Sequence, residues 1–82
     1  MYYVYLLRNA KNVFYVGSTS DLKTRFYQHN QGKSVSTRDG APWTLVYYEA
    51  YETKQYALIR EMKLKHHGKG LSDLKRRLGF VE

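Results

Sequence analysis

Tyr5 and Tyr15, which stand ten residues apart near the start of the chain, are a pair whose type and spacing suggest chemistry. Each lies in a run of β-branched and aromatic residues, and the polar stretch 8–12 between the two runs suits a turn. This pattern predicts a β-hairpin with a loop of about five residues. In a symmetric hairpin Tyr5 would face Tyr15, and Tyr3 would face Gly17. The two phenols would then be neighbours beside an opening at the glycine, unless they are only structural tyrosines of an aromatic-rich sheet.

Two charged residues border the buried stripes of expected helices. Arg25 stands three residues after Leu22 and one before Phe26, so its guanidinium could reach a phosphate with two parallel hydrogen bonds. Glu61 stands four residues after Ala57, and a single carboxylate with several retained waters is an ordinary Mg²⁺ site. The alternatives are a solvated arginine on a helix surface and a glutamate that forms a salt bridge with the basic residues around it.

The order of these elements resembles one enzyme family. The chain is similar to the start of a GIY-YIG nuclease domain in three consecutive motifs: Tyr3-Val4-Tyr5, Tyr15-Val16-Gly17 and Ser20-Asp21-Leu22-Lys23-Thr24-Arg25. The segment 57–61 resembles the one that supplies the metal-binding glutamate of this family. The match covers about residues 2–66 and is closest to small stand-alone members, with further similarity to the nuclease domain of the bacterial excision-repair incision subunit. It implies a metal-dependent endonuclease that hydrolyses DNA phosphodiester bonds in DNA repair or processing.

The resemblance also implies a role for each site residue. Phosphodiester hydrolysis needs a base for the water, positive charge at the transition state and often a metal ion. Tyr15 would be the base, Arg25 would stabilise the transition state, and Glu61 would bind Mg²⁺ or Mn²⁺. Tyr5 would support Tyr15, and His29 could hold a phosphate, move a proton or be incidental. A phenol has an ordinary pKa near 10, so Tyr15 needs neighbouring cations to act as a base at neutral pH.

The chain departs from the family pattern at three places. The first glycine of the family name is Tyr3 here, and Ser18 follows Gly17 where many relatives carry a basic residue. The C-terminal asparagine of the family has no counterpart, because no asparagine follows Asn30.

The composition favours a polyanionic partner. Fourteen basic and seven acidic side chains give a net charge of +7, which for so small a chain points to DNA, or to RNA. The residues expected to bind nucleic acid are Lys23, Lys33, Arg38, Lys63 and Lys65.

Several protein classes are excluded or disfavoured by the same sequence. The absence of cysteine excludes disulfides and cysteine zinc sites, and the adjacent pair His66-His67 is too short for a structural zinc site. The apolar run 4–7 is too short for a signal peptide or a membrane span, so we expect a cytoplasmic protein with no membrane partner.

The remaining pattern predicts the elements that position these side chains. Strands are expected over 2–7, 13–17 and 43–51, and helices from about 21 to 30, 53 to 65 and 72 to 78. The order β-β-α-β-α-α predicts an α/β fold with a small three-stranded, mainly antiparallel sheet flanked by about three helices. We expect one domain over residues 1–82. Strand order stays open, because a helical crossover also permits parallel pairing.

Finer expectations concern caps and buried faces. We expect the segment 18–20 to cap the first helix, with Asp21 in its first turn and Leu22 and Phe26 on its buried side. The polar loop 31–42 could be a flap over a substrate or a plain surface loop. In the third strand, Trp43, Leu45 and Tyr47 should alternate with Thr44, Val46 and Tyr48.

The second half of the chain should pack through aliphatic side chains. On the second helix the inward residues are expected to be Ala57, Leu58 and Met62, and on the third helix Leu71, Leu74 and Leu78. Gly68 and Gly70 should break the chain between these helices, and Gly79 should end the last one in a left-handed conformation.

Two functions from different classes remain open. The first is the metal-dependent endonuclease, and the alternative is a non-catalytic nucleic-acid-binding module that keeps the fold and the basic face. An RNA-recognition domain is a weaker rival, because Phe14-Tyr15-Val16 lacks the surrounding glycine and aromatic signature. Binding alone needs no carboxylate facing a phosphate, so Glu61 favours the enzyme. We expect substrate choice to come from DNA structure or from a partner protein, since so short a chain leaves little room for a targeting domain.

Overall fold

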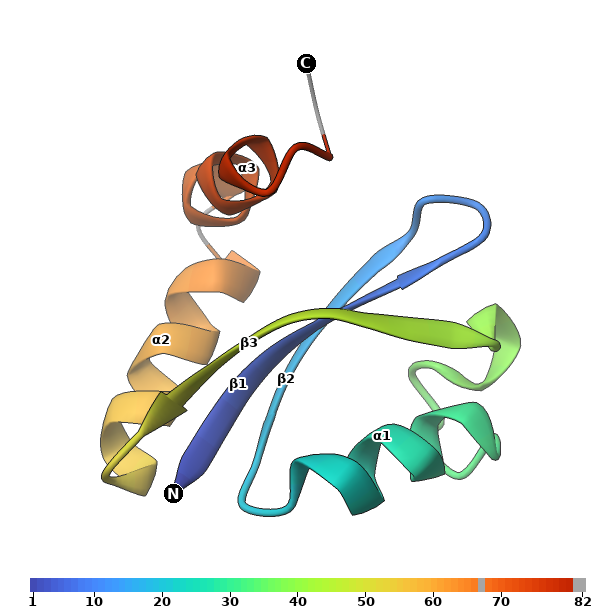
Figure 1. Cartoon of the computed structure of the whole chain (residues 1–82), viewed down its shortest axis with the longest axis horizontal. Helices are drawn as coiled ribbons and strands as arrows, with labels where there is room; N and C mark the ends of the chain where they lie inside the picture. The colour runs from blue at the N-terminus through green and yellow to red at the C-terminus, as the bar shows by residue number, and fades with distance from the viewer. Residues whose placement is uncertain (67, 81–82) are drawn as a thin grey trace.

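A three-stranded antiparallel sheet lies between helices on both of its faces (Figure 1). The computed structural model describes residues 1–66 and 68–80. In this part of the chain the elements are β1 (Tyr2–Asn9), β2 (Phe14–Thr19), α1 (Leu22–Asn30), the 3-10 turn η1 (Arg38–Gly40), β3 (Trp43–Tyr51), α2 (Lys54–His66) and α3 (Gly68–Arg77). The predicted order β-β-α-β-α-α is confirmed.

The strand order that the sequence left open is β2-β1-β3, with both neighbouring pairs antiparallel. The central strand β1 therefore has two buried faces. Val4 and Leu6 pack toward α2 and α3, while Tyr5 and Leu7 pack toward α1, and each is 2% exposed or less. Because β2 is an edge strand, side chains from both layers can reach its outer side.

The predicted register of the hairpin is wrong by two residues. Tyr5 pairs with Gly17, and Leu7 pairs with Tyr15. The turn explains the shift. The side-chain oxygen of Asn9 accepts hydrogen bonds from two backbone N–H groups of the loop, and Asn12 adopts a left-handed conformation with φ of 60°. Asparagine tolerates this conformation better than most residues.

The predicted alternation along the third strand holds as far as Val46 and is wrong from Tyr47 onward. The pairing of β1 with β3 slips between Leu6 and Leu7, which leaves Val46 as an extra residue in β3. After this bulge Val46 and Tyr47 both pack on the side of α2 and α3, whereas Leu45 packs on the side of α1. A bulge adds one residue to a strand and so exchanges the faces that follow it.

The cap of α1 differs from the one expected. Asp21, rather than a residue of 18–20, is the N-cap, and its carboxylate accepts a hydrogen bond from the Thr24 N–H at 3.2 Å. β2 continues to Thr19, so Ser18 and Thr19 pair with β1, and Ser20 lies between the end of the strand and the cap. Leu22 and Phe26 are half-buried, and the one fully buried side chain of α1 is His29.

The inward face of α2 is not the predicted one. Ala57 and Leu64 are buried, but Leu58 is 43% exposed and Met62 is 56% exposed. The buried row thus runs through Ala57, Glu61 and Leu64, at a spacing of four and then three residues. As a result, Glu61 points toward the sheet instead of along the margin of the helix.

Gly68 stands at the boundary between the two helices, as expected, whereas Gly70 lies within α3 and does not break the chain. α3 starts at Gly68, earlier than expected, and includes Gly70. A side chain at Gly70 would lie 3.2 Å from the Lys63 carbonyl oxygen, so the glycine lets α3 approach the end of α2. The inward leucines and the left-handed Gly79, with φ of 86°, are as predicted.

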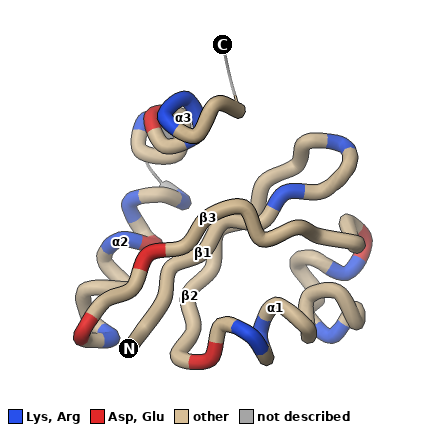
Figure 2. Tube along the Cα trace, viewed as in Figure 1, with Lys and Arg blue, Asp and Glu red and all other residues tan. Residues whose placement is uncertain are grey.

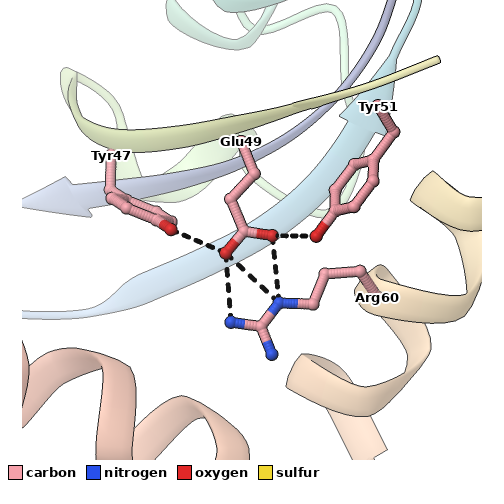
Figure 3. A network of polar contacts seen from close by, with 4 residues as sticks. All are labelled: Tyr47, Glu49, Tyr51 and Arg60. Carbon is pink, nitrogen blue, oxygen red and sulfur yellow. Dashed lines mark hydrogen bonds and ion pairs between the residues drawn. The ribbon is translucent and has the colours of Figure 1, made fainter.

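A polar network fastens α2 to β3 (Figure 3). Glu49 accepts hydrogen bonds from Tyr47 at 2.6 Å and Tyr51 at 2.5 Å, and Arg60 donates to both of its carboxylate oxygens at 3.0–3.2 Å. Burial raises the pKa of Glu49, but the hydrogen bonds from Arg60 and the two tyrosines outweigh it and lower this pKa. Since Arg60 immediately precedes Glu61, the network also fixes the position of Glu61.

Glu49→Gln is expected to lower the free energy of unfolding by about 1–3 kcal/mol at pH 7, because Arg60 loses its charged partner. The folded-state pKa of Glu49 is depressed, so its stabilisation is full above the ordinary value of 4.5 and is lost as pH falls below it. Urea unfolding at pH 7 and pH 3 measures both effects, with Glu52→Gln in the exposed loop as control. An equal loss at both pH values would contradict this account.

Candidate active site

Tyr5, Tyr15 and His29 form a cluster on the α1 side of the sheet. The Tyr5 hydroxyl lies 2.7 Å from His29 Nε2. The ring centroids of Tyr5 and Tyr15 are 6.5 Å apart, and those of Tyr15 and His29 are 5.1 Å apart. The two phenols are therefore neighbours, as predicted, although they are diagonal rather than opposite in the hairpin.

Gly17 provides the space for Tyr5. A Cβ atom at Gly17 would collide with the phenol oxygen of Tyr5, so only glycine can stand opposite this ring. The opening predicted at Gly17 is filled by Tyr5 and does not face solvent. Burial and the neighbouring Tyr15, against the pull of Arg25, raise the pKa of Tyr5 to about 12. Tyr5 thus keeps its proton at neutral pH.

His29 is a buried, neutral imidazole. It is 0% exposed, and burial together with the charge of Arg25 lowers its pKa to about 4. Its Nδ1 lies 2.7 Å from Thr37 Oγ1. A neutral ring donates from one nitrogen and accepts at the other, so the chain Tyr5–His29–Thr37 can carry its protons in either direction. This geometry does not suit a cationic contact between His29 and a phosphate.

The loop 31–42 supplies Thr37, the last member of this hydrogen-bonded row of side chains. Ser34 is 7% exposed and Thr37 is 1% exposed, and the Thr37 carbonyl oxygen accepts a hydrogen bond from Trp43 Nε1 at 2.8 Å. The middle of the loop is thus part of the core beside His29 and is neither a plain surface loop nor a free flap. The sequence pointed to no role for Thr37, because its contact depends on the tertiary approach of the loop to α1.

Glu61 joins the cluster from the opposite layer, past the outer side of β2. Its Oε1 accepts a hydrogen bond from the Ser18 hydroxyl at 2.7 Å, and its Oε2 lies 2.9 Å from Lys65 Nζ. Lys65 Nζ also lies 5.5 Å from the centroid of the Tyr15 ring. Glu61 is near enough to Tyr5 for its charge to raise the pKa of that phenol. The carboxylate, the lysine and both tyrosines therefore share one region at the edge of the sheet.

Arg25 reaches the same region from α1. Its side chain is half-buried, and its guanidinium donates a hydrogen bond to Gln28 Oε1 at 3.2 Å. Its positive charge adds to the effect of burial in lowering the pKa of His29, and it partly offsets the burial that raises the pKa of Tyr5.

The structure separates the other predicted basic residues from this cluster. Lys23 is exposed on α1 at the rim of a cleft of about 520 Å³. Lys33 and Arg38 are exposed on the loop, and Arg38 lies 3.9 Å from Asp39. Lys63 lines a different cleft on the outer side of α2, together with Tyr51 and Tyr56. Lys65 alone of the five contacts the cluster itself, and its spacing of four residues from Glu61 was the signal in the sequence.

The donors present fit a hard divalent cation. Glu61 offers a carboxylate whose side chain is 17% exposed, at the edge of the sheet where water and a phosphate can complete the coordination. Among residues 1–66 and 68–80 no group of three or more His, Cys, Asp or Glu side chains could hold a metal ion, which disfavours a zinc site there. His67 lies outside the described residues.

Three kinds of comparison with known proteins agree. A family model described as the GIY-YIG catalytic domain matches residues 1–77. UPF0213 proteins of Streptococcus pyogenes serotype M5 (strain Manfredo) and serotype M3 (strain SSI-1) are 41% and 39% identical over 64 residues, which is 77% of this chain and 70% of each relative. The solution NMR structure of a UPF0213 protein from Bacillus halodurans is 31% identical, covers 96% of this chain and 88% of its own, and superimposes with a TM-score of 0.59.

Within residues 1–66 and 68–80 no helix combines the length and the apolar character that a membrane span needs.

Proposed function

Because the chain belongs to the GIY-YIG catalytic domain family, we propose that it is a divalent-metal-dependent endonuclease that hydrolyses phosphodiester bonds in DNA. The observation that carries this proposal is the meeting of Glu61 and Tyr15 at the outer side of β2, through their shared contact with Lys65. A carboxylate, a phenol and cations in one place can supply the metal ligand, the base and the positive charge that phosphodiester hydrolysis uses.

In this mechanism Tyr15 removes the proton from the attacking water. Arg25 stabilises the negative charge that develops on the phosphate oxygens in the transition state. Glu61 would hold Mg²⁺ or Mn²⁺, and such an ion supplies Lewis acidity and helps the leaving oxygen depart. Lys65 brings positive charge to this place, with its Nζ 5.5 Å from the centroid of the Tyr15 ring.

Tyr5 and His29 hold Tyr15 in place. Tyr5 cannot be the base at neutral pH, because its pKa is raised to about 12. Its hydroxyl instead forms the buried hydrogen bond with His29, whose ring packs edge-on against Tyr15. The two tyrosines of the site thus have separate roles, which their different surroundings determine: Tyr5 is the positioning residue and Tyr15 the base.

The basic side chains would bind the phosphate backbone. They are distributed over the hairpin, the loop and the helices (Figure 2). We expect about four to six phosphates to be neutralised, which gives a slope of about −3.5 to −5.5 for log K against log[salt] with duplex DNA. Fluorescence anisotropy at several salt concentrations measures this slope, and a value near zero would exclude the footprint.

The second candidate function is a nucleic-acid-binding module without catalysis. It is favoured by one observation, which is that both oxygens of Glu61 already have partners inside the protein, Ser18 and Lys65. Incubation of labelled single-stranded, duplex and branched DNA, and of matched RNA, with and without Mg²⁺ or Mn²⁺ separates the two. Metal-dependent cleavage of any of these substrates supports the nuclease, and tight binding without cleavage of any of them supports the module.

A further inference from the structure

We infer that Lys65 is the resident counter-cation of Glu61: it competes with the divalent ion for this carboxylate and, once displaced, binds a phosphate of the nucleic acid. The inference rests on the proposed function, since it assigns a residue to the same metal and substrate site. It makes Lys65 a residue whose contacts change as the site is loaded, in contrast to a fixed basic residue of the surface.

Lys65 contacts side chains from two different parts of the fold. An ion pair between residues four apart on a helix is common and contributes little by itself. Lys65 differs because its ammonium also lies over the ring of Tyr15, which comes from β2 in another part of the fold. The ammonium is therefore held between the metal-binding carboxylate and the general base. This is the position where positive charge is needed in the absence of a metal ion.

Lys65 is the cation that balances the charge of Glu61. Its side chain is only 17% exposed, and its partners are one neutral hydroxyl, from Ser18, and one cation, Lys65. A shielded carboxylate needs a compensating charge, and Lys65 provides it in the free protein. A divalent ion on the same carboxylate would repel the ammonium and take over this compensation. Binding of the ion and the Lys65–Glu61 contact at 2.9 Å are thus mutually opposed.

The Lys65 side chain can change its conformation. The Lys65 side chain is more exposed than that of Glu61, at 36% against 17%, and its ammonium stands on a flexible four-carbon stem. When Glu61 releases it, the ammonium can turn outward by rotation of its own side chain, without movement of α2. A phosphate held beside Tyr15 is then the nearest anion of the substrate.

Lys63 is the matched control, because it lies on the same helix but lines the cleft on the outer side with Tyr51 and Tyr56. Mn²⁺ binding to the DNA-free protein can be measured by electron paramagnetic resonance. Lys65→Met should bind Mn²⁺ about 2- to 5-fold more tightly than wild type, the factor expected for loss of one partly exposed ion pair. Lys65→Arg and Lys63→Met should stay near wild type, and Glu61→Gln should lose the site.

A second readout uses DNA binding in Ca²⁺ and in chelator, with the salt slope as the observable. In Ca²⁺, Lys65→Met should show a slope smaller in magnitude by about 1 than wild type, since one phosphate contact is missing. In chelator, Lys65→Met and wild type should have the same salt slope. Lys63→Met should change the slope by the same amount in Ca²⁺ and in chelator, or in neither.

Unchanged or weaker Mn²⁺ binding by Lys65→Met, or a wild-type slope for it in Ca²⁺, would overturn the inference. Neither readout depends on cleavage. If both changes occur and no nucleic acid is cut, the role of Lys65 stands and the proposed nuclease activity is rejected.

Discussion

Glu61→Gln is expected to reduce DNA cleavage by a factor of about 10³ or more, because the ion that it would hold supplies several kcal/mol of transition-state stabilisation. The fold should persist. Glutamine still accepts the hydrogen bond from Ser18, and the lost ion pair with Lys65 is partly exposed. Rates are measured with DNA in excess over its dissociation constant and with Mg²⁺ at a limiting concentration.

The control for this variant is Glu52→Gln, which removes one carboxylate from the exposed segment before α2. It should cleave at the wild-type rate. Equal cleavage by Glu61→Gln and wild type at limiting Mg²⁺ would show that Glu61 is a structural salt-bridge residue.

Tyr15→Phe is expected to slow the chemical step by a factor of about 10²–10⁴, the usual loss when a general base is removed. The change keeps the ring contacts with His29, Trp43 and Lys65, so stability and DNA affinity should stay near wild type. The phosphate contacts of the basic residues are also retained. Single-turnover rates at saturating DNA separate this loss of rate from any loss of binding.

Tyr27→Phe serves as the matched control, because Tyr27 lies on α1, is 59% exposed and should tolerate the change without effect. A rate for Tyr15→Phe within twofold of wild type, under conditions where chemistry limits, would reduce Tyr15 to a strand residue. The assigned roles therefore predict that Tyr15→Phe lowers the cleavage rate and that Tyr27→Phe does not.

The sequence predicted the elements better than their pairing. The runs around Tyr5 and Tyr15 are sufficient to indicate two strands, but the register depends on the turn between them. Asn9 and Asn12 determine this turn through side-chain hydrogen bonds and a left-handed conformation. Both asparagines were visible in the sequence, yet the pattern does not reveal which of several turns they select.

The buried face of α2 could not be deduced from its periodicity. Apolar residues occur on several sides of this helix, among them Leu58 and Met62, which are exposed. The choice of face comes from partners that are distant in sequence: Glu49 on β3 binds Arg60, and Gly70 lets α3 pack against the end of α2. Only this choice brings Glu61 toward the sheet.

The structure brings together the side chains that the family resemblance indicated, while their roles stay predictions. Tyr5, Tyr15 and His29 are in contact, and Glu61 lies beside them through Lys65. The burial of His29 was not predictable, because it depends on hydrogen bonds to Tyr5 on β1 and to Thr37 in the loop. A histidine on a short amphipathic helix gives no local sign that it has two buried partners.

The measurement that tests the central claim most directly is the single-turnover cleavage rate of wild-type protein as a function of Mg²⁺ or Mn²⁺ concentration. It is made with the best substrate among single-stranded, duplex and branched DNA. The account predicts no cleavage in chelator, a rate that rises and saturates with the metal ion, and loss of this rise in Glu61→Gln. Tight binding of DNA by wild type with no cleavage at any metal concentration would contradict the account and identify a binding module.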